Sequence, residues 1–219
     1  MEIETLFFDL DDTLYPQNNG LWEAIKDRMS LYMHVRLGLP KEQIPELRRS
    51  YYETYGTTLR GLQRYHQVAA DDYLAFVHDL PLDEYLKPQP EVRAVLESLP
   101  QRKWIFTNAD ADHARRVLQT LALEHIFQGI IDVRALDFAC KPESKAYWRA
   151  LDLAGVTAPE NCLMLDDSPV NLAEARRIGL LTVLVGRSSP HPDADYTLPS
   201  LLDLPRVLPV LWLTRQPVD

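Results

Sequence analysis

The chain has 219 residues and carries 23 Lys and Arg against 32 Asp and Glu, which gives a net charge of −9. This length suits one domain with an insertion or a small second domain. The apolar share of 46% is that of a folded globular protein and excludes a disordered chain. The acidic balance disfavours nucleic acid and anionic membrane surfaces as partners.

The sequence also lacks the marks of secretion and of membrane insertion. Its first residues are acidic where a signal peptide is basic, and no apolar run approaches the roughly 18 residues of a membrane span. The two cysteines, Cys140 and Cys162, fit a reducing compartment better than a disulfide framework, although the sequence leaves their pairing open. We therefore expect a soluble, cytoplasmic protein.

Short apolar segments alternate with helical patterns along much of the chain. Five of these segments are followed by turn-forming residues and predict buried strands at 5–10, 103–107, 129–133, 162–165 and 181–185. Helical patterns lie between them at 112–121, 143–153 and 169–178. Ser168 is placed to cap the last of these helices and Gly179 to end it. This alternation predicts an α/β fold around a mainly parallel sheet, with functional loops at the carboxyl ends of the strands.

One long stretch breaks the alternation. Residues 15–87 contain no convincing strand, only helical runs, and prolines at 16, 88 and 90 mark both of its ends. We predict an α-helical cap, residues 16–87, inserted into a core formed by residues 1–15 and 88–219. Such a cap closes over a site at the strand ends and excludes water. The Pro- and Leu-rich stretch after Ser188 predicts no particular element.

Aspartates follow two of the predicted strands directly. Asp9 and Asp11 come after the first strand, and Asp166 and Asp167 come after the fourth. Because parallel strands end at the same edge of a sheet, these groups can converge, and their charges repel unless a cation neutralises them. An all-oxygen cluster with room for water and phosphate suits Mg²⁺. The alternative is that the carboxylates are solvated loop acids or helix caps.

Two other strand ends supply groups that an anion needs. Thr107 and Asn108 stand just ahead of a helix, where a hydroxyl and free backbone N–H groups bind phosphate oxygens. Lys141 precedes another helix and can offset the charge of a phosphate beside carboxylates. Asp9 is then a nucleophile at phosphorus, forming an aspartyl-phosphate, while Asp11 protonates the leaving oxygen and later activates water. Mg²⁺ screens the anionic nucleophile from the anionic phosphate.

The ordered set resembles the four motifs of the haloacid dehalogenase-like hydrolase superfamily: Asp9-Leu10-Asp11-Asp12-Thr13, Thr107-Asn108, Lys141-Pro142 and Asp166-Asp167. The resemblance implies a Rossmann-like core, a helical cap between the first two motifs, and Mg²⁺-dependent hydrolysis of phosphate esters. It implies that Asp9 is nucleophile and metal ligand, and that Asp11 is the acid/base and binds metal through its backbone carbonyl. Lys141 bridges phosphate and nucleophile. Asp167 is the direct carboxylate ligand, whereas Asp166 acts through water.

Within the superfamily, the segments 7–15, 51–62 and 106–110 resemble the pyrimidine 5'-nucleotidase branch. In the cap segment, Thr58 and Arg60 are candidates to face the cleft, with Arg60 donating to a base carbonyl or to the phosphate. Tyr55 is a candidate to stack on a base. The alternative is that the tyrosines pack cap helices and that Arg60 makes a surface ion pair. The six histidines show no zinc spacing, and we expect His66 and His113 to be packing or surface residues.

These observations favour a Mg²⁺-dependent phosphomonoesterase acting on a small phosphate ester, with a pyrimidine nucleoside 5'-monophosphate as the first candidate. A sugar phosphate or another small metabolite is the alternative substrate, and a non-catalytic binding protein is a distant alternative. A metal-independent carbon–halogen hydrolase does not need Asp11 or the pair Asp166 and Asp167, so we set it aside. We expect no nucleic-acid polymer and no membrane as partners, and a monomer or a weak homodimer.

Overall fold

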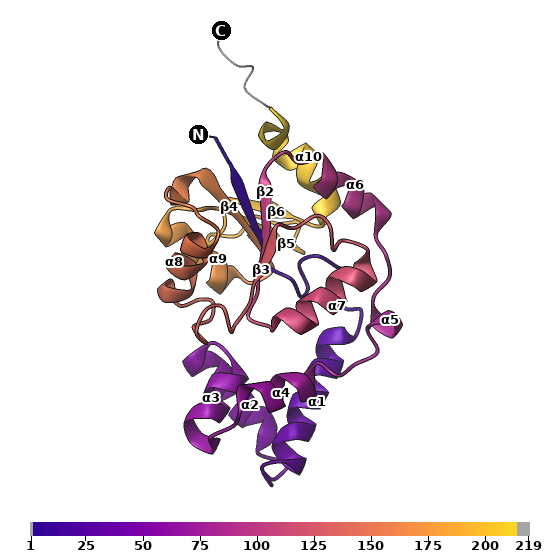
Figure 1. The fold of residues 1–219 in the computed structure, drawn as a ribbon, viewed down its shortest axis with the longest axis vertical. Helices are drawn as coiled ribbons and strands as arrows, with labels where there is room; N and C mark the ends of the chain where they lie inside the picture. Colours follow the sequence, from indigo (N-terminus) through magenta and orange to yellow (C-terminus); the bar gives the residue numbers. More distant parts are fainter. Residues whose placement is uncertain (1, 214–219) are drawn as a thin grey trace.

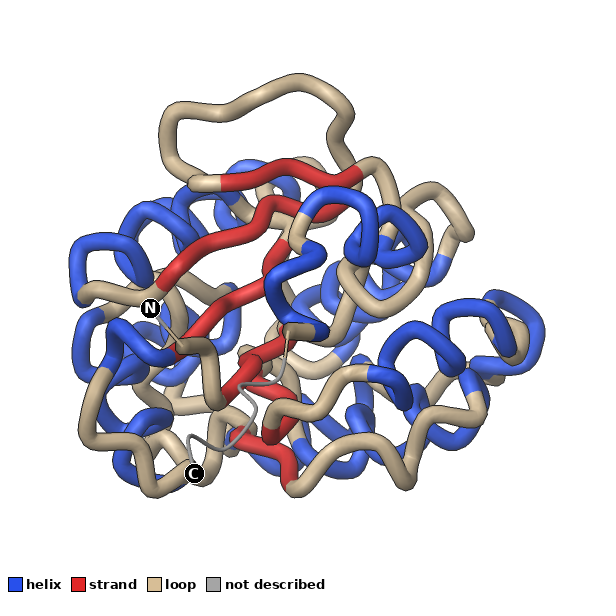
Figure 2. Tube along the Cα trace, turned by 90° about the horizontal axis from the view of Figure 1, so that it is seen from above, coloured by secondary structure: helices blue, strands red, loops and turns tan. Residues whose placement is uncertain are grey.

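Six parallel strands form the centre of the protein, seen here in a computed structural model that describes residues 2–213. Their order across the sheet is β3-β2-β1-β4-β5-β6. The bounds are β1 (Thr5–Phe8), β2 (Arg102–Phe106), β3 (Gly129–Ile131), β4 (Cys162–Asp166), β5 (Leu181–Val185) and β6 (Tyr196–Leu198). The five predicted strands are present, and β6 is an additional strand at the edge. Figure 2 shows the sheet with helices on both of its faces.

The two central strands explain why the sheet has a core on each face. All four residues of β1 are buried, and their side chains alternate between the faces. Phe8 belongs to a hydrophobic cluster that includes Leu165 on one face, whereas Phe7 packs with Phe106 on the other. The register pairs Phe8 with Leu165, and the N–H of Asp9 donates to the carbonyl of Leu165 at 2.9 Å. This register brings the acidic loops after β1 and β4 side by side.

Helices from different parts of the chain cover the two faces. On the Phe8 face lie α6 (Pro90–Ser98), α7 (Ala111–Leu121) and α10 (Leu204–Val207), and the Phe7 face is covered by α8 (Ser144–Leu153) and α9 (Pro169–Ile178). Short 3-10 helices span Pro159–Asn161, Leu201–Asp203 and Pro209–Trp212. The stretch after Ser188, for which the sequence predicted no element, therefore supplies β6 and a helical cover for the sheet.

The ends of α9 agree with the prediction in one respect and differ in another. Gly179 ends the helix with a left-handed φ of 111°, as expected for a terminating glycine. Ser168 occupies the N-cap position, but its side chain makes no capping hydrogen bond, so that prediction is wrong. Instead its backbone N–H donates to Asp166 Oδ1 at 2.8 Å, because the carboxylate of Asp166 closes the turn between β4 and α9.

A separate group of helices lies beyond the carboxyl ends of the strands, at the bottom of Figure 1. It consists of α1 (Leu21–Val35), α2 (Ile44–Tyr55), α3 (Thr58–His66) and α4 (Ala70–Val77), which confirms a helical insertion after the first strand. These helices share a hydrophobic cluster of their own, around Met33 and Leu62. The bounds 16–87 for this cap stay a prediction, because Leu82 of α5 (Leu82–Tyr85) packs with the core cluster.

None of the helices within residues 2–213 has both the length and the apolar character needed to cross a bilayer. Cys140 and Cys162, whose pairing the sequence left open, are both buried free thiols.

Candidate active site

A buried lysine joins two of the predicted aspartates at the edge of the sheet. Lys141 is 1% exposed, and its Nζ lies 2.6 Å from Asp9 Oδ1 and 2.7 Å from Asp166 Oδ2. Burial opposes the charge of Lys141, but the carboxylates of Asp166 and Asp9 raise the pKa of its amine, so the amine stays protonated. The other oxygen of Asp9 accepts a hydrogen bond from Thr13 Oγ1 at 3.2 Å. The orientation of Asp9 is therefore held from two sides.

Three carboxylates cluster at the same edge of the sheet, close to the ammonium group of Lys141. Oxygens of Asp9, Asp166 and Asp167 all lie within 4.8 Å of one another. Burial raises the pKa of Asp9, and the neighbouring carboxylates add to the rise. Burial and the charge of Asp166 raise the pKa of Asp167 to about 7. This excess of close negative charge on oxygen donors fits a hard divalent cation such as Mg²⁺.

The oxygens of these carboxylates are not equally free to bind a cation. Asp166 is fully buried, and besides Lys141 it accepts hydrogen bonds from Ser168 N and, at 3.0 Å, from Asn171 Nδ2. Asp167 is half-buried and accepts one hydrogen bond, from Gln17 Nε2 at 3.2 Å. Asp9 and Asp167 are thus the carboxylates best placed to bind a cation directly, whereas Asp166 is engaged in holding Lys141.

Asp11 is held apart from the Lys141 cluster by contacts of its own. Its Oδ1 accepts from Tyr15 OH at 2.6 Å and lies 3.0 Å from His113 Nε2. Burial opposes ionisation of Asp11, but the charge and hydrogen bond of His113, with help from Tyr15, outweigh it and lower the pKa of the carboxyl. His113 stacks on His78 with ring centroids 4.1 Å apart, and His78 Nδ1 lies 2.5 Å from Asp110 Oδ2.

The residues after β2 organise the loop that carries Lys141. Asn108 donates through Nδ2 to the carbonyl of Lys141 at 3.0 Å and accepts from its N–H at 2.8 Å. Thr107 Oγ1 accepts from Ala109 N at 3.0 Å. The side-chain amide of Asn108 is therefore occupied in holding the Lys141 loop. Both residues line the same cleft as Asp9, Asp11 and Lys141.

The cleft itself has a volume of about 560 Å³ and lies between the strand ends and the cap. Its floor carries Asp9, Asp11, Lys141 and Asp167. Cap residues supply much of the remaining wall, among them Trp22, Lys26, Met29, Arg48, Arg49, Tyr52, Thr58 and Tyr73. A cavity of this size accommodates a small organic ligand together with a phosphate group.

Comparison with known proteins identifies the family. The family model of haloacid dehalogenase-like hydrolases matches residues 3–179. The chain belongs to this family. The match includes every residue of the floor and all four cap helices, so this HAD-like hydrolase carries its candidate site within the matched region.

Individual relatives and structures extend the comparison. Phosphate metabolism protein 8 of Saccharomyces cerevisiae is 31% identical over 193 residues, and the match covers 81% of this chain but only 60% of that protein. Glyceraldehyde 3-phosphate phosphatase of Methanopyrus kandleri is 26% identical over 225 residues, covering 94% of this chain and 95% of that one. The crystal structure of the HAD hydrolase YfnB of Bacillus subtilis, bound to magnesium, has a TM-score of 0.61 at 17% identity, covering 97% of this chain and 100% of that one. That structure shares the fold.

Two of the three cap residues predicted to contact substrate lie outside the cleft lining of this HAD-like hydrolase. Arg60 Nη1 bonds to the carboxylate of Glu143, to the carbonyl of Tyr55 at 3.0 Å and to Cys140 Sγ at 3.5 Å. The hydroxyl of Tyr55 lies 2.7 Å from that of Tyr65. These contacts match the alternative in which Arg60 forms an ion pair and the tyrosines pack together. Thr58 does line the cleft.

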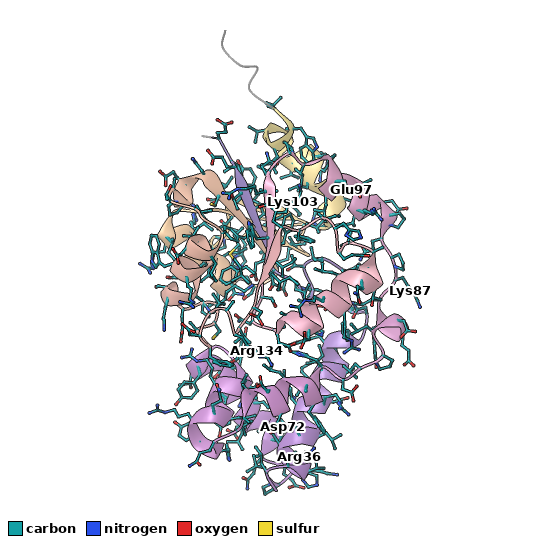
Figure 3. All side chains as sticks on the ribbon, viewed as in Figure 1. Arg36, Asp72, Lys87, Glu97, Lys103 and Arg134 are labelled. Atoms are coloured by element: carbon teal, nitrogen blue, oxygen red, sulfur yellow. The ribbon has the colours of Figure 1, made fainter. Side chains whose placement is uncertain are left out.

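Further polar contacts join the cap to the core. Arg134, in the loop after β3, donates to Asp71 of α4 at 2.7 Å, and Figure 3 shows Arg134 at the junction of the two parts. Arg116 of α7 donates to the carbonyl of His78 at 2.8 Å. These contacts hold α4 over the loops that bear the candidate site.

Sequence reasoning missed the surroundings of Asp11. His113 was expected to be a packing or surface residue, and its side chain is buried but also touches Asp11. His78 belonged to no motif, and Tyr15 was noted only as the end of segment 7–15 and without a role. The one available signal was Asp110, which caps α7 and so fixes His113 in the first turn of that helix. A contact between residues 102 positions apart depends on packing and leaves no local pattern.

Proposed function

We propose that this hydrolase is a Mg²⁺-dependent phosphomonoesterase that forms an aspartyl-phosphate on Asp9. The observation that carries the proposal is the cluster of Asp9, Lys141, Asp166 and Asp167 at the floor of a cleft. The names of the yeast and Methanopyrus relatives, which refer to phosphate metabolism and to a phosphatase, support phosphate ester chemistry.

The residues divide the reaction into two steps. In the first step a carboxylate oxygen of Asp9 attacks phosphorus, the bond from phosphorus to the ester oxygen breaks, and Asp11 protonates the departing oxygen. In the second step water attacks the aspartyl-phosphate, Asp11 accepts a proton from that water, and inorganic phosphate leaves with Asp9 restored. Lys141 orients Asp9 in both steps and offsets the negative charge gathered around phosphorus.

Asp9, Asp167 and the backbone carbonyl of Asp11 are the groups that would hold Mg²⁺. When bound, the ion reduces the repulsion between an anionic nucleophile and an anionic phosphate. Asp166 supports this arrangement indirectly, since its oxygens bind Lys141, Ser168 and Asn171.

For the substrate we propose a pyrimidine nucleoside 5'-monophosphate. The resemblance of segments 7–15 and 51–62 supports this choice, and so does a cleft of about 560 Å³, which has room for more than a three-carbon phosphate. A sugar phosphate or another small metabolite is the second candidate, and the name of the Methanopyrus relative favours it.

The first experiment measures phosphate release from UMP, CMP, AMP, IMP, glucose phosphates and phosphoglycolate, with Mg²⁺ and with EDTA. We expect turnover of UMP and CMP that EDTA abolishes, because removing the cation leaves the carboxylates of the floor unscreened. Mg²⁺-dependent turnover confined to sugar phosphates would keep the chemistry and replace the substrate. No turnover of any ester would favour a binding protein.

The second experiment replaces the nucleophile. Asp9→Asn removes the attacking oxygen with little change in volume, and we expect kcat to fall by about 1,000-fold or more while circular dichroism shows a folded protein. Asp152→Asn, an exposed position on α8, is the matched control and retains activity. Normal hydrolysis by Asp9→Asn would exclude a covalent intermediate on this residue.

A further inference from the structure

The cap side of the cleft is positively charged, although the chain as a whole is acidic. Among the described residues of α1 to α4 that line it, Lys26, Arg48 and Arg49 are cationic and none is acidic. Lys26 and Arg49 each lie near a glutamate of their own helix, at 3.1 and 3.9 Å. Within residues 2–213, Arg48 makes no ion pair with a carboxylate, and its Nη1 donates to Ser30 Oγ at 3.0 Å.

Two polar groups in this wall are buried and have no hydrogen-bond partner in the described part of the chain. They are Arg48 Nε and the hydroxyl of Tyr73. Tyr73 is 2% exposed and nevertheless belongs to the cleft lining, as does Arg48. Buried donors without partners are rare, because each loses its hydrogen bonds to water without a replacement. Two such donors in one wall of a cleft indicate a ligand that accepts from them.

Both side chains are held by their neighbours. The ring of Tyr73 packs edge-on against Tyr32 with centroids 5.1 Å apart. Arg48 is fixed through Ser30, whose hydroxyl in turn donates to the carbonyl of Lys26 at 2.9 Å. The two groups also act on each other, since the charge of Arg48 opposes the rise in pKa that burial imposes on Tyr73. The donors are thus preorganised.

Helix α4 shows where Tyr73 lies relative to the carboxylates on the floor of the cleft. Val77, at the end of α4, and His78 line the cleft, and His78 stacks on the histidine that contacts Asp11. Tyr73 lies four residues earlier, about 6 Å further along the helix axis. Tyr73 is therefore at least one helical turn further from the catalytic floor than Val77 and His78, a spacing that leaves room for a sugar between a phosphate and a second group.

We propose that Arg48 and Tyr73 form a subsite that binds a carbonyl oxygen on the base of a nucleoside 5'-monophosphate. This inference rests on the proposed phosphatase function and deepens it. A neutral carbonyl suits the subsite better than a second phosphate does, because apolar side chains of Met29, Leu59 and Leu74 line the same wall and disfavour a doubly charged group.

The test compares two substrates that differ only in the base, UMP and ribose 5-phosphate. Tyr73→Phe removes one hydroxyl and Arg48→Met removes the guanidinium but keeps an unbranched chain. We expect each variant to lower the ratio of kcat/KM for UMP to that for ribose 5-phosphate about tenfold, the loss of one buried hydrogen bond. Equal losses on both substrates, or no loss, would show that the pair only supports the cap fold and would overturn the subsite.

Matched controls use the same substitutions elsewhere. Tyr196→Phe changes an exposed tyrosine of β6, and Arg36→Met changes an arginine that Figure 3 shows at the far end of the cap from the core. Neither residue lines the cleft, so we expect both controls to leave the substrate ratio unchanged.

A binding experiment separates the subsite from the catalytic proposal. In the Asp9→Asn background, calorimetry measures the Kd for UMP with and without Tyr73→Phe, and we expect about tenfold weaker binding with the substitution. If no phosphate ester is hydrolysed but Tyr73→Phe still weakens UMP binding, the subsite stands and the phosphatase function fails. If esters are hydrolysed while the Kd for UMP does not change, the subsite is wrong and the phosphatase stands.

Discussion

Arg60 illustrates how one tertiary contact changes the meaning of a residue. In the sequence it lies in a Gly- and Thr-rich cap segment and suggests a base contact. In the structure the side chain of Arg60 is partly buried, and its guanidinium contacts Glu143, the carbonyl of Tyr55 and Cys140. Because Cys140 directly precedes Lys141, Arg60 joins the cap to the loop that carries Lys141.

We accordingly expect Arg60→Ala to act on stability rather than on substrate choice. The variant loses charge-assisted hydrogen bonds in a partly buried position, which costs about 1–3 kcal/mol, and thermal denaturation measures that loss. It changes KM for UMP and for p-nitrophenyl phosphate by the same factor. Arg64→Ala, exposed on the same helix, is the control. A selective rise in KM for UMP would return Arg60 to base recognition.

At the scale of elements, the C-terminal end of α2 determines how closely the cap approaches the Lys141 loop. Gly56 ends the helix with a φ of 80°, in the left-handed region. A Cβ at this position would lie 2.8 Å from Cys140 Sγ and 3.2 Å from the carbonyl oxygen of Lys141. The glycine is needed both for its backbone angle and for the contact that it permits.

A comparison of Gly56 with Gly38 separates the cost of the left-handed backbone angle from the cost of the close contact. Gly38 also has a positive φ, 68°, but a Cβ there meets nothing within 4 Å. Gly38→Ala should therefore cost only backbone strain, about 1–2 kcal/mol. Gly56→Ala adds an overlap with Cys140 Sγ and a tight contact with the carbonyl of Lys141, so we expect about 1–3 kcal/mol more and a lower kcat. Urea unfolding and steady-state kinetics measure both effects. Equal losses of stability in Gly38→Ala and Gly56→Ala would mean that the Lys141 loop moves to make room for the added methyl group at little cost.

At the scale of the whole molecule, three hydrophobic clusters show how the cap helices meet the sheet. One hydrophobic cluster packs on each face of the sheet, and a third hydrophobic cluster lies mainly among the cap helices. Val133 and Phe138, in the segment after β3, pack with that third cluster, and Leu21 and Ile25 of α1 belong to the cluster on the Phe8 face of the sheet. Figure 1 shows the cap helices grouped beyond the strand ends, where the connections after β1 and before α6 lead into and out of them.

This architecture predicts local opening on hydrogen exchange. Leu62→Ala, at a fully buried position in the cap cluster, removes about 2–5 kcal/mol of packing. We expect faster amide exchange across α2 to α4 and unchanged protection in β1 and β4, because Leu62 belongs to the cap cluster and not to the clusters on the sheet. Equal acceleration in both regions would show that the cap and the sheet unfold together.

The sequence alone determined the fold class and the floor of the site. Strand, acid and turn signals are local, and parallel strands end at one edge of a sheet, so the acids after β1 and β4 could be expected to converge; the structure adds that these strands are neighbours. Lys141 and Thr107 were found in the same way, as residues just past predicted strands or just before helices.

The tertiary structure decided what faces the floor. Helical periodicity shows which residues of α2, α3 and α4 share a face, but the rotation of each helix follows from the side chains that pack between them. That packing turned Arg48 and Tyr73 into the cleft and Arg60 out of it, toward Glu143. The contact of His113 with Asp11 depends on how α7 lies against the β1 loop. Such long-range choices are settled by interior packing and charge pairing, which short sequence patterns do not contain.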